Sequence, residues 1–104
     1  MRRAARTDGN QADIIAALTA AGCSCQSLAG VGDGCPDLLV GWGGSSGRLA
    51  VMEIKDPTKP IADQEFTPKQ KQWHRAWRGP AHLVRSADEA LAIVTFYRVG
   101  KVAA

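Results

Sequence analysis

The segment from Arg48 to Lys55, which reads RLAVMEIK, constrains the fold of this chain more than any other part of the sequence. Side chains of a β-strand alternate between its two faces. Apolar residues occupy both faces of this segment: Leu49, Ala50, Val51, Met52 and Ile54. This pattern predicts a central strand covered on both sides. The segment 37–41 (DLLVG) also reads as a strand and 42–47 as a turn of Gly and Ser, so we expect a hairpin over 37–55.

Three other segments carry helix signals. Residues 10–13 (NQAD) open a helix that ends near Gly22, and its apolar residues recur at helical spacing: Ile14, Ile15, Leu18 and Ala21. Residues 67–70 (TPKQ) combine a Thr N-cap, a Pro in the first turn and a Gln three residues after the cap. That helix ends at the following RGP sequence. Residues 86–89 (SADE) form a second capping box, which opens a helix through about residue 97.

The remaining segments complete the expected fold. Short strands are predicted near residues 23–28 and 82–85, with loops at 29–36 and 56–65. The resulting order of elements is αβββαβα. A mixed central sheet flanked by helices, an α/β fold, is the natural architecture for this order.

Length and composition limit the class of protein. With 104 residues, 45% of them apolar, the chain predicts a single domain over residues 1–104, in which 1–9 form a flexible basic tail. No apolar run approaches the roughly 18 residues of a membrane span, and no apolar export segment follows the basic N-terminus. We therefore expect a cytoplasmic protein without membrane association. The net charge of +3 fits a nucleic-acid partner, but a solvated basic surface fits it equally.

The cysteines carry a weak signal. Three cysteines, Cys23, Cys25 and Cys35, are an odd number in a chain expected in the cytosol, which argues against a disulfide framework. Their spacing also lacks the paired Cys-x2-Cys arrangement of common zinc folds. We expect them to be small buried apolar residues.

The chemically informative residues are Asp37 and the Glu53-Ile54-Lys55 sequence. In an antiparallel hairpin the start of one strand lies beside the end of the next, so Asp37 should meet Glu53 and Lys55. Paired carboxylates repel each other unless a cation lies between them, and oxygen ligands suit Mg²⁺. A neighbouring lysine can stabilise charge that develops on a phosphate. The alternative is a surface salt bridge, which the apolar strands and the glycine loop before Asp37 make less attractive.

Taken together, these motifs resemble a known group of proteins, the PD-(D/E)xK nuclease superfamily, and in particular its VRR-NUC-type branch, which includes many phage-encoded proteins. The resemblance spans roughly residues 8–95. It rests on these stretches: 8–11 (DGNQ), 32–41 (GDGCPDLLVG), 53–56 (EIKD) and 67–70 (TPKQ) with Trp73.

The resemblance implies a restriction-endonuclease-like fold and a Mg²⁺-dependent DNA endonuclease, in which Mn²⁺ substitutes for Mg²⁺. Asp37 and Glu53 would bind the metal through their side chains, Ile54 would bind it through its backbone carbonyl, and Lys55 would be the catalytic lysine. Many members carry a glutamate on the first helix, where this chain offers Gln11 and Asp13. Gln11 is either a residue near the site that makes a hydrogen bond there or simply a first-turn residue of the helix.

The resemblance also implies a biological setting. The substrate would be branched, nicked or duplex DNA in phage or bacterial replication, recombination or repair. The protein would act in the cytoplasm of a bacterial or phage-infected cell, often as a homodimer.

Several alternatives stay open at this stage. Gln70 is either a capping residue or a member of the site that contacts Lys55, water or phosphate. Trp73 and Trp77, four residues apart on one helix face, are core or interface residues, or else they stack on splayed bases. The chain could also be a non-catalytic nucleic-acid-binding or regulatory module on the same fold. A last alternative is a zinc-bound interaction domain with four ligands: Cys23, Cys25, Cys35 and His82.

Overall fold

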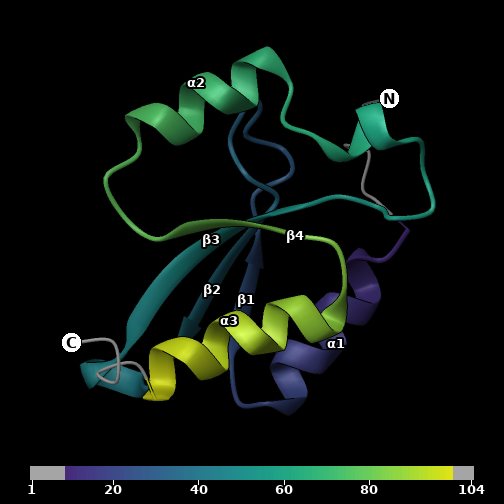
Figure 1. Ribbon diagram of the computed structural model, residues 1–104. Helices are drawn as coiled ribbons and strands as arrows, with labels where there is room; N and C mark the ends of the chain where they lie inside the picture. The colour runs from purple at the N-terminus through teal and green to yellow at the C-terminus, as the bar shows by residue number, and fades with distance from the viewer. Residues whose placement is uncertain (1–8, 100–104) are drawn as a thin grey trace, which may run out of the picture.

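The structure, a computed structural model, describes residues 9–99, so most of the predicted basic tail at 1–9 lies outside the described residues. Its helices and strands follow the predicted αβββαβα order (Figure 1). They are α1 (Gln11–Ala20), β1 (Ser24–Ser27), β2 (Leu38–Trp42), β3 (Arg48–Ile54), α2 (Pro68–Ala76), β4 (Ala81–Val84) and α3 (Ala87–Val99). Two short 3₁₀ turns, Gly44–Ser46 and Ile61–Gln64, interrupt the loops.

The four strands form one mixed sheet in the order β1-β2-β3-β4. β1 pairs with β2 and β2 with β3 in antiparallel fashion, whereas β3 and β4 are parallel. The hairpin of β2 and β3 sets Leu38 opposite Met52 and Val40 opposite Ala50. The predicted α/β class, the hairpin and the interior position of β3 are therefore confirmed.

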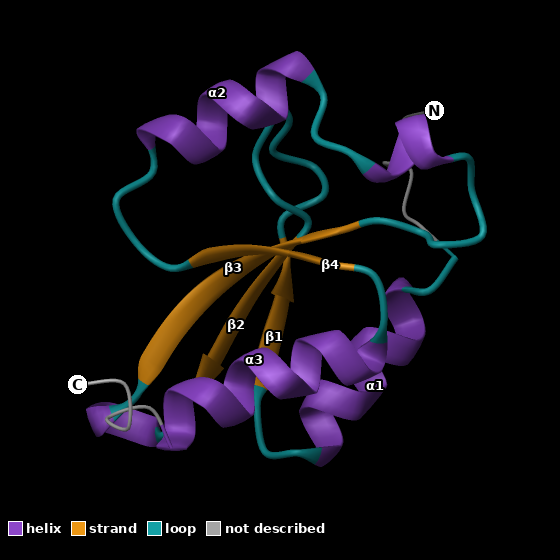
Figure 2. Ribbon diagram, viewed as in Figure 1, coloured by secondary structure: helices purple, strands orange, loops and turns teal. Residues whose placement is uncertain are grey.

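Helices lie on both sides of the sheet, with α1 and α3 on one side and α2 on the other (Figure 2). The core fills the space between the sheet and the α1–α3 pair. Its most deeply buried members come from both helices and three strands: Ile14, Leu18, Leu38, Val40, Met52, Ile54, Val84 and Val94. The alternation in β2 and β3 sends these side chains to the helix pair and their neighbours toward α2. None of the helices within residues 9–99 combines the length and the apolar character that crossing a bilayer requires.

The structure departs from the predicted elements in two places. The predicted cover on both faces of β3 fails at Leu49, which is 61% exposed. Its partner across the hairpin is Gly41, and β4 begins its pairing only at Val51, so little stands beside Leu49. α2 also ends at Ala76, earlier than predicted, and Trp77 is already extended with ψ 136°.

The glycine-rich loop before β2 packs against the start of α2. Three successive residues in this loop have positive φ: Gly32 at 78°, Asp33 at 55° and Gly34 at 82°. Left-handed backbone of this kind favours glycine. Gly34 also has no room for a side chain, because a Cβ atom there would overlap the backbone carbonyl of Lys69. The missing side chain therefore lets the loop touch the first turn of α2.

Candidate active site

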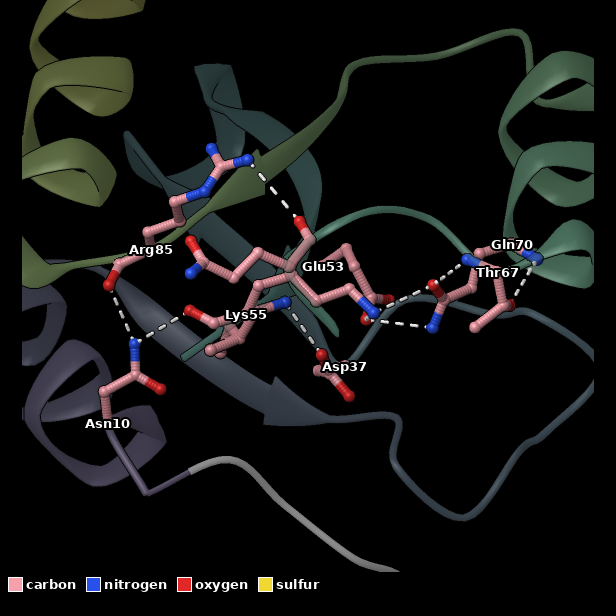
Figure 3. Close-up of polar contacts among 9 residues, drawn as sticks. Asn10, Asp37, Glu53, Lys55, Thr67, Gln70 and Arg85 are labelled. Atoms are coloured by element: carbon pink, nitrogen blue, oxygen red, sulfur yellow. Dashed lines mark hydrogen bonds and ion pairs between the residues drawn. The ribbon is translucent and has the colours of Figure 1, made fainter. Parts of the chain in front are cut away.

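Asp37 lies beside the end of β3, as the hairpin predicts (Figure 3). It directly precedes β2, and its N–H donates to the Met52 carbonyl over 3.1 Å. Its Oδ2 accepts a hydrogen bond from the Ile54 N–H at 2.7 Å. Backbone groups on either side of Glu53 thus fix Asp37, so the two carboxylates are brought to one edge of the sheet.

Glu53, Lys55 and Gln70 form a closed polar cluster on the α2 side of the sheet (Figure 3). The Gln70 Nε2 donates to Glu53 Oε2 over 3.1 Å, and the Lys55 Nζ donates to Gln70 Oε1 over 3.0 Å. Lys55 Nζ and Glu53 Oε2 lie 3.5 Å apart, and their side chains are only 10% and 4% exposed. This ion pair is therefore buried, unlike the surface salt bridge considered from the sequence.

Gln70 serves the helix and the site at once. Its Oε1 accepts from the Thr67 N–H at 2.9 Å, and its own N–H donates to Thr67 Oγ1 over 3.2 Å, which completes the predicted capping box. The same Oε1 accepts from Lys55. Gln70 therefore makes both the capping contact and the contact with Lys55, because one amide has enough donors and acceptors for both. Its membership of a catalytic site stays a prediction.

The surroundings of Glu53 disfavour the charged form of its carboxyl group. Burial, followed by the negative charge of Asp37, raises the pKa of Glu53 to about 8, although Lys55 pulls the pKa in the opposite direction. Glu53 Oε1 is buried and accepts no hydrogen bond in the described part of the chain. A buried oxygen with no donor beside a second carboxylate is the arrangement that a bound cation would relieve.

One residue at the site escaped the sequence analysis. The Asn10 Nδ2 donates to the Lys55 carbonyl over 3.2 Å and to the Arg85 carbonyl over 2.9 Å, so Asn10 joins the ends of β3 and β4 (Figure 3). Its side chain makes no capping bond to α1. An Asn before a helix normally signals an N-cap, and no sequence pattern distinguishes this tertiary role.

The next residue, Gln11, is buried and its Oε1 accepts no hydrogen bond within residues 9–99. Its predicted place near the site stays a prediction.

The proposed zinc ligands do not come together. All three cysteines are free, Cys23 buried and Cys25 and Cys35 half-buried, and residues 9–99 contain no group of three or more His, Cys, Asp or Glu that could hold a metal. His82 instead makes a 2.9 Å hydrogen bond with the Tyr97 hydroxyl. Cys35 lies nearest the candidate site: burial raises the pKa of its thiol, and so do the charges of Glu53 and Asp37.

Comparison with known proteins adds no assignment: no family, no curated protein and no solved structure matches the chain.

Proposed function

We propose that this protein is a metal-dependent nuclease on a restriction-endonuclease-like fold, with Asp37, Glu53 and Lys55 as its catalytic set. The observation that carries the proposal is Glu53 Oε1, a buried carboxylate oxygen without a hydrogen-bond donor beside the carboxylate of Asp37. Buried polar atoms in folded proteins usually have a partner, so this oxygen favours a bound cation over a salt bridge alone. The strand order and the mixed sheet agree with this fold.

The donors present fit a hard divalent cation. Asp37 and Glu53 through their carboxylates and Ile54 through its backbone carbonyl would hold Mg²⁺, with Mn²⁺ as a substitute, because these cations favour oxygen ligands. Two carboxylates and a carbonyl are also typical of sites where the metal keeps several waters. When bound, the metal would supply an activated water and neutralise charge on a phosphate.

The chain's own residues supply the rest. Lys55 presents a buried ammonium, which Gln70 and Glu53 hold from two sides at 3.0 and 3.5 Å. A cation fixed in this way stabilises negative charge on the phosphate as the transition state forms, without reorganising at that moment. Gln70 positions Lys55 and Glu53 relative to each other, and Asn10 fixes the backbone at Lys55.

DNA is the proposed substrate, in branched, nicked or duplex form, and the setting is phage or bacterial DNA metabolism. Exposed cations on and after α2 support a phosphate-binding surface near the site: Lys69, Lys71, Arg75 and Arg78.

A homodimer is also proposed, because α3 leaves Phe96 and Val99 57% and 53% exposed. Light scattering at micromolar concentration should give twice the chain mass, and a monomer mass with and without DNA would contradict it.

Cleavage of a panel of labelled linear and branched DNAs tests the proposal. Wild-type protein should cut with Mg²⁺ or Mn²⁺ and not in EDTA, and Ca²⁺ should support binding better than cleavage. Asp37→Asn should abolish cleavage together with the Mg²⁺-induced rise in Tm that a ligand of the native state produces. Cleavage at the full rate in EDTA would refute the mechanism. DNA binding without cleavage in any metal would favour the non-catalytic binding module.

A further inference from the structure

The side of β3 that faces α2 is polar at one end and apolar at the other. Alternation places Lys55, Glu53, Val51 and Leu49 on this one face, in that order from the candidate site outward. The polar end contacts Gln70 of α2. Beyond it, an apolar cavity of about 480 Å³ opens between the sheet and α2, a size typical of ligand pockets. Its lining includes Cys35, Leu39, Leu49, Val51, Trp73 and Trp77. The cavity therefore lies beside the candidate active site on the same face of β3.

One wall of the cavity is aromatic. Trp73 and Trp77 stack with ring centroids 4.7 Å apart and planes inclined by 18°. Trp77 is nevertheless 45% exposed, so its indole is only partly covered. Gly79 packs closely on this ring, because a Cβ atom there would lie 3.0 Å from Trp77 Nε1. A pair of stacked indoles, one of them 45% exposed, therefore lines this side of the cavity.

The outer side of α2 is positively charged. Lys71 and Arg75 are exposed, four residues apart on α2, and each is two residues from Trp73, so they lie on a different side of the helix from the cavity. Arg78 is exposed just after the end of the helix. No acidic residue occurs from Phe66 to Ala87, so no carboxylate of this segment neutralises these cations.

We propose that this cavity receives an unpaired nucleobase of the strand whose phosphate lies at the Asp37–Glu53 site. The inference rests on the proposed function and names its substrate class, a strand with an unpaired nucleotide next to the cut. Val51 lies two residues from Glu53, roughly 7 Å along the strand, which is within the reach of one nucleotide. A base offers a planar apolar face that can stack on Trp77. A base within an intact duplex cannot enter without leaving its stack.

The test uses the full chain and a labelled branched DNA with an unpaired strand at its junction, together with a set of the same substrate in which one abasic site moves along that strand. Cleavage is measured in Mg²⁺ and binding in EDTA. At one fixed offset from the cut, loss of the base should lower kcat/KM about tenfold. Trp77→Ala should slow cleavage of the intact strand about tenfold and leave that abasic strand unchanged, while Trp77→Phe should retain the difference. If Trp77 had only a structural role, Trp77→Ala would slow cleavage of the intact strand and of the abasic strand alike.

Ile61→Ala is the matched control, because it removes an exposed apolar side chain, 76% exposed and outside the lining of the cavity, and should change neither rate. Cleavage that is equally fast at every abasic position overturns the inference and leaves the proposed function standing. Base-dependent binding without cleavage supports the cavity as a base site and overturns the proposed function. A homodimer that Trp77→Ala dissociates and Phe96→Ala does not would assign the cavity to a second copy of the chain and overturn the inference. The abasic series on wild-type protein decides the matter even if a Trp77 variant does not fold.

Discussion

Gln70 on α2 and Glu53 on β3 are joined by a hydrogen bond of 3.1 Å from Nε2 to Oε2. The same glutamine also closes the capping box that begins α2. The start of the helix and the buried carboxylate are therefore fixed by one side chain, and its two tasks can be separated by mutation.

Gln70→Ala should reduce both stability and cleavage. It removes half of the capping box and leaves Lys55 and Glu53 without their amide partner, so we expect a loss of about 1–3 kcal/mol in the free energy of unfolding. Cleavage should fall about 10–100-fold, the range for a residue that orients metal ligands. Thr67→Ala is the matched control: it removes a capping oxygen at a cost of about 1 kcal/mol but leaves the contacts of Gln70 with the site. Urea titration shows whether both variants are folded under the assay conditions. Equal cleavage rates of the two folded variants would argue against a positioning role for Gln70.

Lys55→Ala should separate chemistry from binding. The loss of a fixed cation at the phosphate should slow cleavage by about 10²–10³-fold, whereas DNA binding should weaken far less. Lys69→Ala removes the same charge from one of the exposed phosphate-binding positions, where the side chain is 74% exposed and lies 3.8 Å from Asp33. It should weaken DNA binding slightly and leave the single-turnover rate at saturating protein near that of the wild type. Single-turnover rates and binding isotherms for both variants provide the comparison. Wild-type cleavage by a folded Lys55→Ala protein would show that the site is assigned wrongly.

The raised pKa of Glu53 predicts how stability depends on pH without metal. The pKa rises from 4.5 for the free side chain to about 8 in the fold, so the native state holds a proton that the unfolded state releases between these values. The stabilisation is present in full below about 4.5 and is lost as the pH rises through about 8. Urea unfolding in EDTA across this range should therefore show the wild-type free energy falling relative to that of Glu53→Gln. A difference that is flat or rises with pH would contradict the burial of Glu53 beside Asp37.

Two glycines of the same loop allow a matched test of the contact with α2. Gly34→Ala places a side chain where φ is 82° and where the Lys69 carbonyl leaves no room for a Cβ atom. Gly32→Ala places one where φ is 78° but no atom lies within 4 Å. Gly32→Ala should cost about 1 kcal/mol from backbone strain alone. Gly34→Ala should cost more and should also lower cleavage, because α2 must move and take Gln70 with it. Equal thermal stability and equal activity of the two variants would mean that the contact does not position the helix.

The sequence predicted those parts of the site that depend on regular pairing. Asp37 and Glu53 could be placed together because the hairpin register brings the start of β2 beside the end of β3. Gln70 could not be assigned to one task, because a capping box and a site contact use the same amide and the local pattern reports only the first. Asn10 could not be assigned to the site either, because an Asn before a helix normally signals an N-cap and the local pattern does not report its bonds to the Lys55 and Arg85 carbonyls. The exposure of Leu49 depends on where β4 begins to pair, which no periodicity within β3 encodes.

The helix that carries Gln70 and Trp73 is attached to the rest of the protein less firmly than the other two helices. None of the residues of α2 is fully buried, whereas α1 and α3 both contribute to the core. Segments with few buried apolar contacts open locally at lower free energy than the whole molecule. Backbone amides of α2 should thus exchange with deuterium well before those of α1, through excursions that detach Gln70 from Lys55 and Glu53. The polar cluster would then assemble and come apart with each excursion, so a bound nucleic acid that spans α2 and the sheet should slow that exchange.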